Sequence, residues 1–119
     1  RHPLPGDGLI VATPTGTTAY AMSSGGPLCF PELDALMIVP VCPHTLSVRP
    51  LVVPADFRIT LRPEGPASLY LDGQEEVALN PGEFLHLTRA RETVEMLHLA
   101  TPDFFKLLRE KLGWRGSLV

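Results

Sequence analysis

The stretch Gly6–Gly26 reads GDGLIVATPTGTTAYAMSSGG. It joins an apolar run to a segment rich in glycine, serine and threonine that holds one carboxylate and no Lys or Arg. The run from Leu9 to Ala12 predicts a short buried strand. Thr17 is suited to cap a short helix over Ala19–Ser23, which the Gly25-Gly26 pair would stop. The stretch is therefore either a polar turn after a strand or a cradle for a phosphate-bearing ligand.

The composition favours one soluble, strand-rich domain. The chain has 119 residues, of which 45% are hydrophobic and 19% are charged, enough to bury a core. Thirteen prolines suit short strands and turns better than long helices. The net charge of −3 offers no basic field for nucleic acid. No apolar run approaches the roughly 20 residues that cross a bilayer, so we expect no membrane partner and a cytoplasmic location.

Further strands follow along the chain. Ala35–Val41 (ALMIVPV) predicts a second buried strand, whereas Phe57–Leu61 and Ala67–Leu71 alternate as half-exposed strands do. Asp72-Gly73 follows the last of these and is a strong hairpin-turn signal. The remaining predicted strands are Leu46–Val48, Leu51–Val53, Val77–Leu79, Phe84–Thr88 and Thr93–Leu99.

The end of the chain changes to a helical pattern. Thr101 is the predicted N-cap, with Pro102 in the first helical position. One apolar stripe with spacing i, i+3, i+4 and i+8 follows, formed by Phe104, Leu107, Leu108 and Leu112. Gly113 would end the helix. The predicted fold is mainly β, a β-sandwich of short strands with a C-terminal amphipathic helix.

Short motifs alone leave the chemistry open. The glycines match neither the P-loop nor the dinucleotide fingerprint, and no G-x-S-x-G elbow is present. Cys42 and His44 hint at metal binding, but no second pair has suitable spacing, so we predict no metal site. Cys29 and Cys42 are expected to be reduced and buried. Asp72 is either an ordinary turn residue or a substrate contact.

Longer runs of sequence resemble the NAD kinase family. GDGLIVATPTGTTAYAMSSGG is similar to the family signature GDG-[LI]-[IV]-x-[ST]-TP-[ST]-G-[ST]-TAY-x-x-S-x-GG. The family's TPICPHSLS-x-RP segment resembles VPVCPHTLSVRP, and its terminal FF-x-x-LR-x-KLGW resembles FFKLLREKLGW. LDGQ (Leu71 to Gln74) lies between them. The resemblance covers essentially the whole chain in the same order.

The resemblance implies a division of labour. NAD kinases transfer the γ-phosphoryl group of ATP, or of polyphosphate, to the adenosine ribose 2′-hydroxyl of NAD. An N-terminal α/β domain carries a GGDG motif, and a C-terminal β-sandwich holds much of the NAD. The only GDG here is Gly6-Asp7-Gly8, and the chain begins at Arg1, so we expect a fragment. Residues 1–100 would form the NAD-binding sandwich, and residues 101–119 a tail that packs on the missing N-terminal domain. The fragment alone should be inactive.

The resemblance also implies the site residues. Asp7 takes the place of the carboxylate that contacts the nicotinamide end of NAD, and Asp72 that of the acid near the ribose or adenine. Thr15, Thr18, Ala19, Tyr20 and Ser23 match positions that hold the rest of the nucleotide. The catalytic GGDG aspartate is expected on the missing domain, so no catalytic residue and no metal ligand is predicted in this chain.

The family also implies partners and cofactors. These are NAD, ATP or polyphosphate with Mg²⁺ or Mn²⁺ in the full-length enzyme, the N-terminal domain, and further copies in a dimer or tetramer. Two alternatives remain: a non-catalytic nucleotide-binding β-sandwich, and a C-terminal domain like that of the lipid or diacylglycerol kinases. The TPTGTTAY and CPHTLSVRP runs argue against the lipid kinases, which do not share both.

Overall fold

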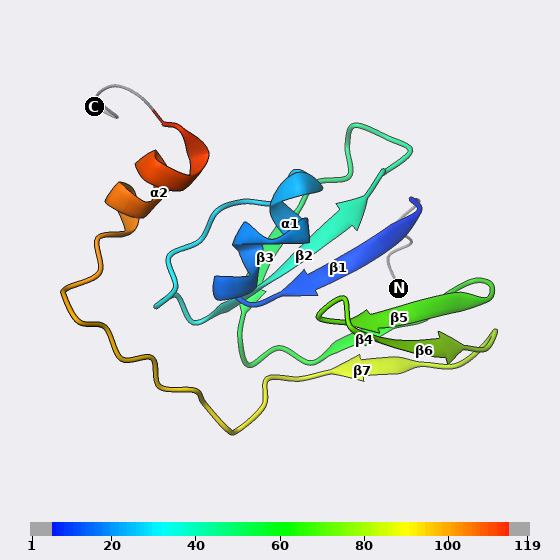
Figure 1. Cartoon of the computed structure of the whole chain (residues 1–119). Helices are drawn as coiled ribbons and strands as arrows, with labels where there is room; N and C mark the ends of the chain where they lie inside the picture. Colours follow the sequence, from blue (N-terminus) through cyan, green and yellow to red (C-terminus); the bar gives the residue numbers. More distant parts are fainter. Residues whose placement is uncertain (1–5, 115–119) are drawn as a thin grey trace.

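The computed structural model describes residues 6–114 and is mainly β (Figure 1). Its elements, in chain order, are β1 (Gly8–Ala12), the 3-10 helix η1 (Thr15–Thr18), α1 (Tyr20–Ser23), β2 (Ala35–Val41), β3 (Leu51–Pro54), β4 (Ile59–Leu61), β5 (Ala67–Leu71), β6 (Glu75–Leu79), β7 (Leu85–Leu87) and α2 (Phe104–Leu112). The expected combination of short strands with a C-terminal helix is confirmed.

The first sheet holds β1, β2 and β3 in that order, with both pairs antiparallel. β2 lies in the centre and is mostly buried, which explains its nearly continuous apolar sequence. Its register places Gly8 opposite Val41 and Ala12 opposite Met37. The loop after β1 thus begins beside the middle of β2, where η1 and α1 cover the sheet (Figure 1).

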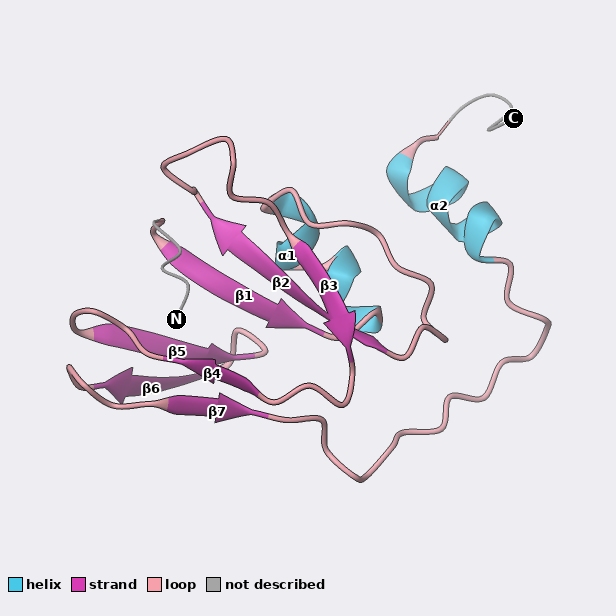
Figure 2. Ribbon diagram, turned by 180° about the vertical axis from the view of Figure 1, so that it is seen from behind, coloured by secondary structure: helices cyan, strands magenta, loops and turns pink. Residues whose placement is uncertain are grey.

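The other four strands form two antiparallel pairs, β4 with β7 and β5 with β6. Both figures show them together on one side of the first sheet (Figure 2). The predicted turn between β5 and β6 is confirmed. Asp72 and Gly73 have φ angles of 50° and 70°, the positive values that both central positions of a type I′ turn require, and the Gln74 backbone N–H donates to the Leu71 carbonyl oxygen.

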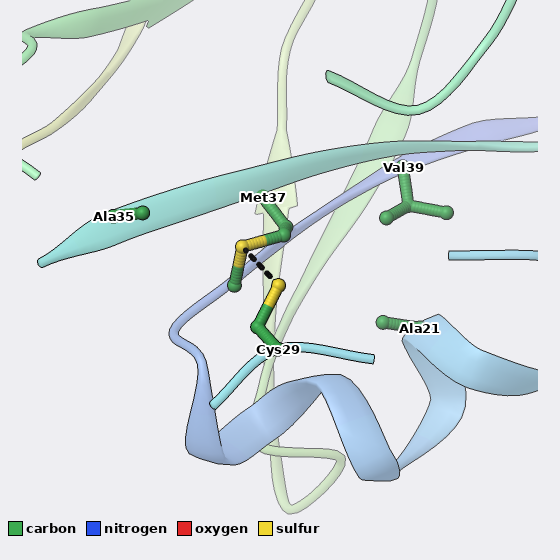
Figure 3. Close-up of a cluster of buried hydrophobic side chains, with 5 residues drawn as sticks. All are labelled: Ala21, Cys29, Ala35, Met37 and Val39. Atoms are coloured by element: carbon green, nitrogen blue, oxygen red, sulfur yellow. Dashed lines mark hydrogen bonds between the residues drawn. The ribbon is translucent and has the colours of Figure 1, made fainter. Parts of the chain in front are cut away.

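The buried core is small and lies between β2 and α1. Ala21, Cys29, Ala35, Met37 and Val39 form it (Figure 3). The Cys29 thiol donates to the Met37 sulfur, with 3.4 Å between the two atoms. Gly26 lies against the core so closely that a Cβ there would be 2.7 Å from the Ala21 carbonyl oxygen. Close packing of α1 on the sheet therefore requires glycine at this position.

The chain after β7 runs without regular structure to α2 (Figure 1). Arg89 forms an ion pair with Asp34 at the start of this segment. At its end, the ring of Phe30 packs on Phe104, with the ring centroids 4.6 Å apart, and on Phe105 at 5.4 Å. The loop before β2 therefore holds both ends of the segment. Gly113 ends α2 in the left-handed conformation with φ 65°, as predicted.

Two predicted strands and three local details are wrong. Leu46–Val48 and Thr93–Leu99 form no strand, because neither has a hydrogen-bonded neighbour within residues 6–114. Asp103, not Thr101, caps α2, since its carboxylate accepts from the Lys106 backbone N–H at 3.0 Å. Ala19 rather than Thr17 precedes α1. Both thiols are free as expected, but only Cys29 is buried.

Within residues 6–114, the helices are too short and too polar to span a lipid bilayer.

Candidate functional site

Asp7 stands at the start of β1 with its side chain in solvent. Its backbone N–H donates to the Val41 carbonyl oxygen at 3.0 Å, which continues the pairing of β1 with β2. The side chain makes no other described contact than one with His44, whose Nε2 lies 3.7 Å from Oδ1, and both side chains are more than 60% exposed. Screening by water makes such an exposed pair weak, so the carboxylate is available to a ligand.

The hydroxyl groups after β1 divide into a structural and an exposed set. Thr17 is fully buried. Its hydroxyl donates to the Pro14 carbonyl oxygen at 2.6 Å and accepts from the Cys29 backbone N–H at 3.4 Å. That threonine anchors η1 to the core and is not a ligand contact. The exposed hydroxyls include those of Thr15, Thr18, Tyr20 and Ser23. Together with the exposed Ala19, these residues are the predicted site residues of this segment.

These five residues are exposed on η1, on α1 and at the residue between them, and we call them the cradle. The Thr18 hydroxyl donates within the cradle to the Thr15 carbonyl oxygen at 3.3 Å. Tyr20 is 63% exposed, so its ring is free to stack on a planar group. Acidic and basic side chains are absent from the sequence between Gly8 and Gly26. The cradle offers hydroxyls, an aromatic face and backbone groups to a polar ligand.

No close contact within the described chain requires a glycine at position 16. A Cβ added there would meet its nearest atoms at 3.6 and 3.7 Å, which is ordinary contact. At Gly26, by contrast, the packing of α1 excludes a side chain. Bare backbone at Gly16 thus leaves room for something outside the described chain to approach closely.

The structure brings five of the seven predicted site residues together and leaves two elsewhere. Asp7 lies at the far end of β1, about 17 Å along a five-residue strand from the cradle. Asp72 belongs to the hairpin of another sheet. A ligand that contacts both Asp7 and the cradle must be extended, as a dinucleotide can be.

A polar group beside Asp72 escaped the sequence analysis. The Tyr70 hydroxyl donates to Glu76 Oε1 at 2.9 Å. Hydrogen bonds from Ser68 and then Tyr70 lower the pKa of Glu76, and the bond to Glu76 raises the pKa of Tyr70. Alternation along β5 and pairing of Tyr70 with Glu76 across the turn between β5 and β6 were the signals that could have revealed this group.

Metal ligation has little support among the described residues. No group of three or more His, Cys, Asp or Glu side chains is placed to hold a metal ion there. The hint from Cys42 and His44 therefore gains no third ligand within residues 6–114.

A mainly β domain that exposes a charge-free cradle of hydroxyls and backbone fits a class of nucleotide-holding modules. Residues 4–99 match the family described as ATP-NAD kinase C-terminal domain. The chain belongs to the NAD kinase family.

Individual relatives of the chain are also NAD kinases. The chain is 46% identical over 115 residues to an NAD kinase of Marinomonas sp., which covers 93% of this chain and 39% of the relative. An NAD kinase of Nitrosomonas europaea is 44% identical over 119 residues, or 98% of this chain and 40% of the relative. The chain thus spans about two fifths of the length of the curated relatives it matches. The lipid kinase alternative is not favoured.

Solved structures are similar as well. A yeast NADH kinase complexed with NADH superposes with a TM-score of 0.85 at 31% identity, over 96% of this chain and 34% of the yeast chain. An NAD kinase from Archaeoglobus fulgidus in complex with ATP gives a TM-score of 0.67 at 32% identity, over 72% of this chain and 33% of the archaeal chain.

Proposed function

We propose that this chain is the NAD-binding part of an NAD kinase, which phosphorylates the adenosine ribose 2′-hydroxyl of NAD to make NADP. The observation that carries the proposal is the coincidence of the family match with an exposed cradle at the family's signature. Thr15, Thr18 and Tyr20 are accessible, whereas the hydroxyl of the buried Thr17 makes its hydrogen bonds within the protein. The segment presents to solvent the groups that a nucleotide would need.

Each predicted residue has a proposed role in this site. Asp7 accepts hydrogen bonds from the carboxamide at the nicotinamide end of NAD. The cradle holds the other nucleoside, with Tyr20 packed on its ring and the Thr15, Thr18 and Ser23 hydroxyls toward sugar or phosphate oxygens. Ala19 contributes its backbone, and Asp72 accepts from a ribose hydroxyl or the base.

The phosphoryl donor, ATP or polyphosphate, belongs to the rest of the longer polypeptide in this proposal, together with the GGDG aspartate. Mg²⁺ or Mn²⁺ would accompany the donor and neutralise charge on its phosphates. The described residues do not fit a metal site of their own, because no three metal-ligating side chains meet. In this proposal the described residues bind and orient NAD.

We also propose that the tail packs on an N-terminal domain. The molecule exposes 9601 Å², whereas a self-contained domain of 13.0 kDa exposes about 6,300 Å². Its radius of gyration is 16.2 Å against about 13.5 Å for a compact chain of this length. In the segment before α2, Val94, Leu97 and Leu99 are at least 90% exposed. Such apolar side chains are suited to a partner surface.

Self-association and a cytoplasmic location complete the proposal. β3 is an edge strand of the first sheet and exposes about half of Leu51 and Val52, so another copy could dock there. Light scattering on the full-length polypeptide would measure the number of copies. Two free thiols without a disulfide suit a reducing compartment.

The test is a kinase assay on the full-length polypeptide. It is incubated with NAD, ATP or polyphosphate and Mg²⁺, and NADP is measured with a coupled NADP-specific dehydrogenase. We expect NADP to form with at least one donor and to depend on the metal. NAD binding without any NADP formation would instead support the non-catalytic alternative, and the absence of NAD binding would overturn the proposal.

A further inference from the structure

A cavity of about 310 Å³ is lined by residues of η1 and α2. Thr18 lines it from η1, and Leu107, Leu108, Lys111 and Leu112 line it from α2. The walls are therefore apolar except for one hydroxyl and one ammonium group. Its volume is at the lower end of the range for small-molecule sites, about 300–1,000 Å³, which suits one nucleoside better than a whole dinucleotide.

Lys111 occupies an unusual position on α2. It follows Leu107 by four residues and Leu108 by three, so it shares their face of the helix. That face is otherwise the apolar stripe. A cation near the C-terminus of a helix interacts favourably with the helix dipole, but Arg109 already provides one on the polar side. The dipole therefore does not explain why a lysine stands within the apolar face.

The other cations of α2 have partners, whereas Lys111 has none in the described part of the chain. Lys106 lies 3.9 Å from Glu110, and Arg109 lies 4.0 Å from Asp103. Within residues 6–114 no carboxylate is within 4.0 Å of the Lys111 ammonium group. Lys111 is exposed, so its ammonium group carries its charge in water at the edge of the cavity and is available to an anion that enters there.

We propose that this cavity binds the phosphate and adjoining nucleoside of an adenine nucleotide, with Lys111 as the counter-charge of the phosphate. The leucines form the apolar wall against the nucleoside, and Thr18 joins the cavity to the cradle. The inference rests on the proposed function and adds to it a charged contact from α2, an element outside the family match at residues 4–99. Lys111 is also the lysine of the terminal FF-x-x-LR-x-KLGW resemblance. The inference makes α2 part of the binding site as well as part of a docking surface.

The test measures binding by calorimetry on the full-length polypeptide, with NAD, AMP and adenosine as ligands. Lys111→Met keeps most of the apolar stem and removes the charge. We expect this substitution to lower the affinity for NAD and for AMP at least tenfold, as loss of a charged hydrogen bond does. The affinity for adenosine should change by less than twofold. Lys111→Arg should retain most of the affinity. Lys106→Met is the matched control on the polar face and should change nothing.

Ionic strength gives a second readout that a structural role would not move. The affinity of the parent protein for AMP should fall as salt rises, and that of Lys111→Met should depend on salt much less. Equal losses for AMP and adenosine, or unchanged AMP affinity in Lys111→Met, would overturn the inference while NAD binding by the parent protein keeps the proposed function intact. If the parent protein binds no nucleotide at all, the proposed function itself fails.

Discussion

Asp7 lies between two glycines, exposed, and contributes little to folding. Its only described side-chain partner is the exposed His44 at 3.7 Å. We therefore expect Asp7→Asn to leave the melting temperature nearly unchanged. The affinity for NAD should fall about tenfold to a hundredfold, because a charged hydrogen bond worth about 1.5–3 kcal/mol is lost. Calorimetric titration of the full-length polypeptide measures this. Asp56→Asn, at another exposed carboxylate, is the control, and unchanged affinity in Asp7→Asn would remove Asp7 from the site.

Tyr20 is expected to act mainly through its ring. The structure places it in the cradle with 63% of its surface exposed, and Tyr70 on β5 is similarly exposed at 61%. Tyr20→Ala should weaken NAD binding strongly because the stacking surface is lost, whereas Tyr20→Phe should cost much less. Tyr70→Phe and Tyr70→Ala are the matched comparisons. Equal losses for the two Tyr20 variants would show that the hydroxyl carries the contact.

The sequence could identify the cradle but not which of its hydroxyls are free. Thr15, Thr17 and Thr18 look alike in the sequence, yet only Thr17 is buried. The Thr17 hydroxyl accepts a hydrogen bond from the Cys29 backbone N–H, twelve residues away along the chain. No local pattern carries that information. The position of Lys111 beside Thr18 depends in the same way on how the chain after β7 returns to η1.

The β5–β6 hairpin carries a pH-dependent contact. Bonds from Ser68 and then Tyr70 lower the pKa of Glu76, so the stability they give is present above the unfolded pKa of Glu and is lost as pH falls through the lower folded value. Titration by NMR should find the Glu76 pKa below that of an unperturbed glutamate. Ser68→Ala should raise it more than Tyr70→Phe does, since the Ser68 bond is the larger cause. The reverse order would contradict this account.

Local sequence patterns correctly predicted strands that pair with a neighbouring strand. Ala35–Val41 and Ala67–Leu71 match β2 and β5 at both ends, because each pairs with a neighbour along nearly its whole length. Thr93–Leu99 is also rich in apolar residues but has no pairing in the described chain. A strand requires a second chain segment to accept its hydrogen bonds, and the residues of the strand itself do not encode that partner.

The segment after β7 and helix α2 should be weakly protected in the isolated chain. Only Leu108 of α2 is buried, and Val94, Leu97 and Leu99 are at least 90% exposed. Few buried contacts mean low local stability, so we expect amides from residue 90 to 112 to exchange much faster than those of β2. In the full-length polypeptide the same amides should be protected. Strong protection of α2 in a verified monomer of the isolated chain would contradict the proposed docking.

In the proposed division, this chain supplies the binding surface and another part of the polypeptide supplies the machinery for transfer. In-line phosphoryl transfer needs the 2′-hydroxyl, the donor phosphates with their metal ions and a positioned carboxylate in one closed site. Asp7 and Asp72 are the acids in the proposed site, and the length of β1 or a different sheet separates each from the cradle. The described residues also gather no metal-ligating group of three.

The isolated chain should therefore bind NAD weakly and transfer no phosphate. We expect its NAD affinity to be well below that of the full-length polypeptide, because in the proposal the N-terminal domain supplies the rest of the site, and NADP formation from NAD, ATP and Mg²⁺ to stay at the level of a protein-free blank. A coupled dehydrogenase assay follows the product, with the full-length polypeptide as the positive control. Circular dichroism first verifies that the isolated chain is folded. Turnover of about 1–100 per second, the usual range of kinases, would show that these 119 residues contain the catalytic groups, and would overturn the proposed division between NAD binding and catalysis.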